Sequence, residues 1–168
     1  MTDLSELTAR VRRLEDLEAV RATWLEYCNR LDAEDFAGLG AVFTEDARLA
    51  VVGLSAGLDG TYSGRRAIVE DFYARTGTSS GDGAGAMTGH LSTNMQIELA
   101  GDEATTLAYF FEIVDDDLVL IGTYQHRMRR DTDRWRIAVL HISVRYRARL
   151  QAERVRGRSL REILGRPV

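Results

Sequence analysis

Apolar residues recur every three or four positions over the first part of the chain, which is the spacing of one helix face. The positions are Leu4, Leu7, Val11, Leu14, Leu17, Val20, Trp24, Tyr27 and Leu31. This pattern predicts one long amphipathic helix. A short helical stretch follows from Asp35, with Leu39, Val42 and Phe43 as its apolar positions, and the β-prone run 47–52 comes next.

A glycine-rich turn over 53–60 separates that strand from a third predicted helix. The helix begins after Ser63-Gly64 and ends near Thr76, and it can turn Ile68, Val69, Phe72 and Tyr73 inward. Residues 77–89 are rich in glycine and nearly lack large apolar side chains. This segment can bury little surface, so we expect either a pocket lid or a tether.

Four β-rich runs follow, over 90–99, 104–114, 118–130 and 134–147, and short polar turns separate them. They predict consecutive antiparallel hairpins. Because helices precede strands, the expected class is α+β, with the helices packed on one curved sheet. Residues 148–168 are expected to form a helical tail, and the pattern indicates a single domain over 1–168.

The composition excludes several kinds of protein. The net charge is -4, and all 22 of the Lys and Arg residues are arginine, so Schiff-base catalysis by a lysine is excluded. Basic residues are scattered except near the end of the chain, which argues against a nucleic-acid partner. Cys28 is the sole cysteine, which favours a reducing, cytoplasmic setting, and neither a signal peptide nor a membrane-spanning run is evident.

The three histidines, His90, His126 and His141, all lie in predicted strands of one sheet. Strand alternation places His90 on one face with Ser92, Asn94 and Gln96, and places His126 on one face with Tyr124. These polar stripes either line a concave surface or face water. In the second case the core positions of the first of these strands are Leu91, Thr93, Met95, Ile97 and Leu99.

Asp32 lies one residue after the last apolar position of the first helix, where an anion gains nothing from the helix dipole. One interpretation is an exposed side chain beside Asp35. The other is that Asp32 points inward and hydrogen-bonds a histidine ring, which would create a general acid/base pair.

Four segments carry a resemblance to a known family. They are YCNRLDAEDFAGLGAVFTEDA, SGRRAIVEDF, GHLSTN and GTYQHRMRRDTDRWRI. Their order and spacing resemble the SnoaL-like and scytalone dehydratase-like proteins of the nuclear transport factor 2-like superfamily. The resemblance covers nearly the whole chain, and it implies a cone-shaped α+β barrel with N-terminal helices on a strongly curved, mostly antiparallel sheet.

The resemblance also implies a site. In scytalone dehydratase-like enzymes an aspartate at the end of the first helix orients a histidine on the sheet, and Asp32 and His90 match these positions. The chain departs from that pattern in three places, one of which is the first strand, where LAVVG lacks the tyrosine expected there. Gly122 and Tyr124 stand where those enzymes have polar substrate contacts, and Tyr109-Phe110 stands where a second histidine is expected.

A cofactor-independent acid/base enzyme is therefore the leading expectation, either a lyase (dehydratase) or an isomerase or polyketide cyclase of secondary metabolism. His90, held by Asp32, would remove a proton, and Tyr124 or His126 would protonate the leaving hydroxyl or the oxyanion. Aromatic candidates favour a hydrophobic substrate. The expected substrate-binding residues are Trp24, Tyr27, Asn94, Tyr109 and His141.

The residues also allow other functions. The fold also serves as a non-catalytic ligand-binding or assembly module, in which Asp32 and His90 need not touch. Two histidines and a carboxylate could hold a metal, but no compact ligand motif supports this, and GDGAGAMTG lacks the lysine of a phosphate-binding loop. Since such domains commonly pair, we expect a homodimer or higher homo-oligomer.

Overall fold

The computed structural model describes residues 3–77, 90–114, 118–132 and 134–149. The helices are α1 (Leu4–Asp32), α2 (Phe36–Gly40), α3 (Arg65–Ala67), the π-helical turn η1 (Ile68–Tyr73) and α4 (Ala74–Gly77). The strands are β1 (Phe43–Val52), β2 (Gly60–Ser63), β3 (Leu91–Ala100), β4 (Glu103–Val114), β5 (Leu118–Asp131) and β6 (Arg134–Arg149). The predicted α+β class is confirmed.

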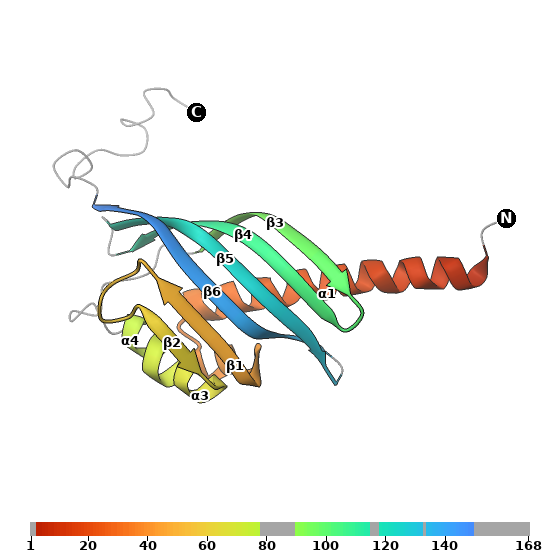
Figure 1. Cartoon of the computed structure of the whole chain (residues 1–168), viewed down its shortest axis with the longest axis horizontal. Helices are drawn as coiled ribbons and strands as arrows, with labels where there is room; N and C mark the ends of the chain where they lie inside the picture. The colour runs from red at the N-terminus through yellow and green to blue at the C-terminus, as the bar shows by residue number, and fades with distance from the viewer. Residues whose placement is uncertain (1–2, 78–89, 115–117, 133, 150–168) are drawn as a thin grey trace, which may run out of the picture.

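The six strands form one mixed sheet in the order β2-β1-β6-β5-β4-β3. Strands β3 to β6 form the predicted antiparallel meander, whereas β1 runs parallel to β6. Helix α1 crosses one face of this sheet, and its N-terminal part extends beyond the strands (Figure 1). The sheet therefore has an inner face, covered by the helices, and an outer face.

Helix α1 starts at the N-cap Asp3 and buries only its second half, through residues such as Val20, Trp24 and Leu31. The large apolar residues of its first half are exposed, from Leu4 at 76 % to Leu14 at 65 %. The predicted long helix is confirmed, but its apolar positions are buried only over the second half. Three successive three-residue steps, from Val11 through Leu14 and Leu17 to Val20, each fall about 60° short of a full turn, which moves the apolar stripe around the helix.

The core lies between the helices and the inner face of the sheet. Its largest fully buried side chains include Trp135, Tyr27, Phe43 and Phe72. Phe43 opens β1 rather than closing a helix, because α2 ends at Gly40. Strand β2, which the sequence pattern did not predict, pairs antiparallel with β1 at the edge of the sheet.

Two predicted segments lie largely outside the described residues. They are the glycine-rich segment beyond Gly77 and the tail, of which β6 includes 148–149. In the part of the chain that is described, no helix is long and apolar enough to cross a membrane.

Candidate functional site

A cavity of about 330 Å³ lies between the helices and the inner face of the sheet. Its walls are mostly apolar and come from α1, the segment after β1, η1 and the inner faces of β4, β5 and β6. The apolar members include Leu31, Leu54, Leu58, Phe72, Phe110, Val114, Leu118, Leu120, Ile142 and Val144. Five lining side chains can exchange or share protons, namely His90, Glu112, Tyr27, Tyr73 and Tyr124.

Asp32 and His90 are in direct contact. Asp32 is the last residue of α1, and its carboxylate accepts the backbone N–H of His90 at 3.1 Å and 3.2 Å. Its Oδ1 also lies 2.5 Å from the Nδ1 of the His90 ring. Because a carboxylate only accepts, Nδ1 carries the proton and Nε2 points the other way. The imidazole is 2 % exposed, whereas the Asp32 side chain is 30 % exposed.

The other side of the His90 ring meets Glu112, a residue that the sequence pattern did not single out. Nε2 lies 3.2 Å from Glu112 Oε1, which also accepts the Tyr124 hydroxyl at 2.6 Å. Glu112 is buried on β4. The signal was present in the alternation of this strand, where Glu112 is the one charge among the inward positions 104, 106, 108, 110, 112 and 114.

Tyr27 and Tyr73 also line the cavity, with their hydroxyls 2.7 Å apart, and its other polar members are Ser55, Thr76, Arg147 and Arg149. Burial raises the pKa of Tyr27 well above its usual range, and the neighbouring Tyr73 and Tyr124 raise it further. Burial also raises the pKa of Tyr124, with a further contribution from the charge of Glu112. Both phenols are therefore hydrogen-bond donors at neutral pH rather than phenolates.

Gly122 makes room for this arrangement. A Cβ at this position would lie 2.1 Å from the Ser143 carbonyl oxygen and 2.6 Å from the Phe110 ring. Phe110 packs on Tyr124, with ring centroids 4.5 Å apart. Because Gly122 has no side chain, the Phe110 ring can pack directly against the backbone of β5. Gly122 therefore has a packing role and is not a polar substrate contact.

His126 and Trp24 lie in the packed layer beside the cavity instead of lining it. His126 is 3 % exposed, bonds Thr106 at 2.5 Å, and packs on the Trp24 ring. Burial lowers the pKa of His126 to about 3, so its ring is neutral. Trp24 stacks on Tyr27 and donates from Nε1 to Ser92, which supports Tyr27 from behind.

Three other predicted substrate contacts lie away from the cavity. Asn94 is exposed at a β-bulge, where its φ is 54°. Tyr109 is 41 % exposed on the outer face of β4, and His141 lies on the outer face of β6, opposite Gln125. The structure thus brings together Asp32, His90, Tyr27 and Tyr124, and separates them from Asn94, Tyr109 and His141.

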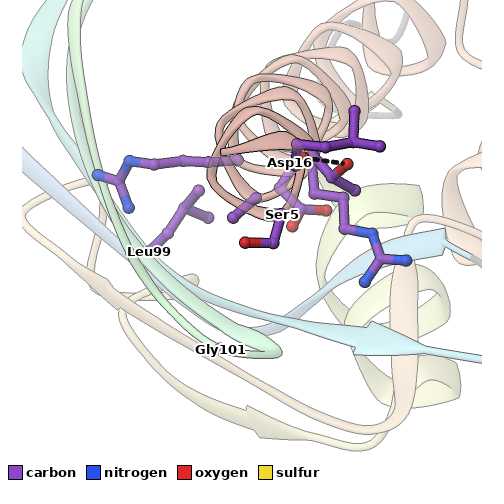
Figure 2. A pocket seen from close by; sticks show the side chains of 9 residues that line it. Ser5, Asp16, Leu99 and Gly101 are labelled. Atoms are coloured by element: carbon purple, nitrogen blue, oxygen red, sulfur yellow. Dashed lines mark hydrogen bonds between the residues drawn. The ribbon is translucent and has the colours of Figure 1, made fainter. Parts of the chain in front are cut away.

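A wider, more open groove of about 720 Å³ lies between the first turns of α1 and the turn that joins β3 to β4. Figure 2 shows Ser5 and Asp16 on the helix facing Leu99 and Gly101 across it. Asp16 is already paired with Arg130 and accepts the indole N–H of Trp135 at 3.3 Å. The groove therefore lacks the buried, reactive side chains that the smaller cavity has.

Among the described residues, no group of three or more His, Cys, Asp or Glu side chains is arranged to hold a metal ion. The cavity polar groups instead contact one another: Asp32 hydrogen-bonds His90, Tyr124 hydrogen-bonds Glu112, and the Nε2 of His90 lies against Glu112. Such contacts can orient a histidine and transfer protons.

The helix-covered curved sheet and its enclosed cavity define the NTF2-like α+β class of proteins. A family model described as a SnoaL-like domain matches residues 12–141, and the chain belongs to this SnoaL-like family. No curated protein sequence matches the chain significantly.

Several solved structures share the fold. An NTF2-like protein with a cystatin-like fold from Novosphingobium aromaticivorans is 25 % identical, with a TM-score of 0.68, and the match covers 95 % of this chain and 99 % of that one. A candidate scytalone dehydratase from the same organism is 20 % identical, with a TM-score of 0.65 and coverage of 83 % and 90 %. The hexachlorocyclohexane dehydrochlorinase LinA-type3 from Novosphingobium barchaimii is 16 % identical, with a TM-score of 0.66 and coverage of 84 % and 94 %.

Proposed function

We propose that this chain is a cofactor-independent acid/base enzyme that dehydrates, isomerises or cyclises a hydrophobic small molecule. One observation carries the proposal. His90 is buried in the wall of a mostly apolar cavity, and its Nδ1 lies 2.5 Å from Oδ1 of Asp32. A carboxylate that fixes the tautomer of a histidine prepares the other nitrogen for proton transfer. A scaffold that only binds or assembles has no chemical need for this pair.

In this mechanism His90, held by Asp32, exchanges a proton with a carbon next to a carbonyl group. Tyr124 lines the same cavity and is the candidate donor to the oxyanion or to the leaving hydroxyl. His126, the alternative acid, is neutral and does not reach the cavity lining, so Tyr124 is the better candidate.

The substrate class follows from the walls. Leu31, Phe72, Phe110 and their apolar neighbours favour a hydrophobic, ring-containing molecule, and we propose a polyketide or another secondary metabolite. The names of two structural neighbours, a candidate dehydratase and a dehydrochlorinase, denote eliminations. Loss of water from a substrate of this chain would belong to the same class of reaction.

The test is hydron exchange on an enolisable bicyclic ketone. The native protein, incubated with 2-tetralone in D₂O, is expected to speed deuterium uptake next to the carbonyl, as followed by proton NMR. Asp32→Asn and His90→Ala should each reduce this rate by about 10²-fold or more. Asp71→Asn is the matched control, since Asp71 is exposed on η1 outside the cavity.

A native rate retained in both variants would contradict the proposal. The chain would then be better described as a non-catalytic ligand-binding or assembly module of the same fold. Tight binding of the ketone without exchange would point to the same conclusion.

Two expectations about context also remain proposals. We propose that the chain forms a homodimer, because several large apolar side chains are exposed on the outer face of the sheet. We also propose a cytoplasmic location, since Cys28 is the sole cysteine and is buried as a free thiol.

A further inference from the structure

We propose that Glu112 and His90 share one proton and transfer protons together, so that the reactive unit is Asp32–His90–Glu112 and not the Asp32–His90 pair alone. The inference rests on the proposed function for its catalytic part, and it adds a second catalytic residue. Glu112 lines the cavity, so it can contact a bound substrate.

The contacts of the two ring nitrogens of His90 support the shared proton. Nδ1 donates to Asp32, which leaves Nε2 facing Glu112 Oε1 at 3.2 Å. An unprotonated Nε2 and an ionised carboxylate would place two lone pairs against each other in a buried site, which is unfavourable. A proton on Nε2 or on the carboxyl group of Glu112 removes this repulsion.

The charges of the site support the same conclusion. Glu112 is 9 % exposed at its side chain and lies against the His90 ring, and Arg147 and Arg149 line the same cavity. Tyr124 donates a hydrogen bond to the same carboxyl oxygen that lies against Nε2. A buried carboxyl group held in this way is stable when it either pairs with an imidazolium or keeps the proton itself.

These two forms give a balanced reaction cycle. In the imidazolium–carboxylate form, Glu112 takes a proton from the carbon next to the substrate carbonyl, and the C–H electron pair becomes a C=C bond. The carbonyl π pair moves to its oxygen, which takes the Nε2 proton. Glu112 is then protonated, His90 is neutral, and the substrate is an enol; Asp32 holds the Nδ1 proton throughout.

The second half of the cycle restores the site. The enol O–H proton returns to Nε2 and the C=O bond re-forms. If the C=C pair takes the Glu112 proton at the carbon that lost one, the result is exchange. If the enol is conjugated to a second double bond, the pairs shift and the Glu112 proton is taken at the far carbon, which is isomerisation. If the next carbon carries a hydroxyl, the pair forms a C=C bond to that carbon and expels the hydroxyl, which leaves as water with the Glu112 proton, and this is dehydration. The first step thus makes Glu112 the base and His90 the acid. In this cycle Glu112 replaces His90 as the group that takes the proton from carbon, and His90 replaces Tyr124 as the acid.

Proton NMR of the histidine rings tests the shared proton without a substrate. The native protein should show two strongly downfield proton signals at His90, one from the Nδ1–H toward Asp32 and one from the proton shared by Nε2 and Glu112. Glu112→Gln should abolish the second signal and keep the first, and Asp32→Asn should do the reverse. His126, with its pKa lowered to about 3, supplies a neutral ring as an internal reference.

Hydron exchange on 2-tetralone tests the catalytic part. Glu112→Gln should reduce the exchange rate by about 10²-fold or more, with the binding constant for the ketone nearly unchanged. Glu103→Gln, the same change at an exposed position of β4, should leave the rate at the native value. Glu112→Asp keeps a carboxyl group one methylene further away and should recover part of the loss.

The outcomes separate the two proposals. A Glu112→Gln spectrum with both downfield signals would overturn the shared proton, and a folded Glu112→Gln variant with the native exchange rate would overturn the catalytic role. If the native protein exchanges no proton with the ketone, the proposed function fails, and the NMR comparison still decides whether Glu112 and His90 share a proton.

Discussion

At the scale of single residues, the buried His126 couples folding to pH. Burial lowers its pKa to about 3 in the folded chain, from an ordinary value near 6.5 in the unfolded chain. Between these values the unfolded chain binds a proton that the folded chain does not. The stabilisation is therefore fully present above about pH 6.5 and is lost as the pH falls toward 3, at about 1.4 kcal/mol per pH unit.

Urea unfolding at pH 7.5 and at pH 5 checks this prediction. The free energy of unfolding of the native chain should fall by roughly 1 to 2 kcal/mol more than that of a His126→Leu variant, because leucine has no proton to bind. Comparison with the variant removes the contribution of carboxyl groups that titrate nearby. Equal pH dependence in the two proteins would mean that His126 is charged, or solvated, in the folded state.

The candidate site was predictable from residue types only in part. Asp32 and His90 could be named because their positions match a family pattern, and the structure places them in contact. Glu112 was missed because a glutamate in a strand is ordinarily a solvent-facing residue. The predicted acid–histidine pair also involved one ring nitrogen of His90 and left out the partner of the second. His126 was overestimated because strand alternation places it on the inner face but does not show whether that position lines a cavity or the core.

At the scale of elements, one β-bulge in β3 determines which residues of this strand face the helices. Thr93 pairs with Tyr109 and Gln96 pairs with Leu107, so Asn94 and Met95 both lie opposite one residue of β4. Before the bulge the even-numbered residues His90 and Ser92 point inward, and after it Met95, Ile97 and Leu99 are the more buried. The sequence offered two alternatives for this strand, with either the even-numbered or the odd-numbered residues facing inward. Neither describes the whole strand, because the bulge inverts the alternation.

The bulge yields a prediction at Asn94, whose φ of 54° lies in the left-handed region. Asn94→Gly should leave the free energy of unfolding within about 0.5 kcal/mol of the native value, since glycine adopts this conformation readily. Asn94→Val should lower it by about 1 to 2 kcal/mol, because a β-branched residue is strained there. Urea unfolding of the three proteins measures both differences, and a valine variant as stable as the glycine variant would show that the bulge relaxes.

At the scale of the whole molecule, local patterns predicted the meander but not how the sheet is extended. The strands β3 to β6 follow one another with short turns, so sequence order gave their pairing. The parallel pairing of β1 with β6 joins residues such as Leu49 and Leu140 that are far apart in the chain. Such a pairing depends on tertiary packing of the helices against the sheet, which no local pattern contains.

The outer face of the sheet carries an apolar row that four strands build together. Register aligns Leu91 with Phe111, Phe111 with Ile121, and Ile121 with Tyr146. These side chains are 38 % to 61 % exposed, and Tyr109 lies beside them. An exposed sheet face normally carries polar and charged side chains, so a continuous apolar row favours burial against a second copy of the chain.

The homodimer that we propose should therefore depend on this row. Ile121→Arg places a charge in its middle and should shift the chain from dimer to monomer in sedimentation velocity, because burying an unpaired charge costs several kcal/mol. Leu14→Arg is the matched control, since Leu14 is a similarly exposed apolar residue on the first half of α1, away from the sheet row. If Leu14→Arg dissociates the dimer and Ile121→Arg does not, the exposed stripe of α1 is the interface; a native chain that sediments as a monomer at every concentration would exclude the homodimer.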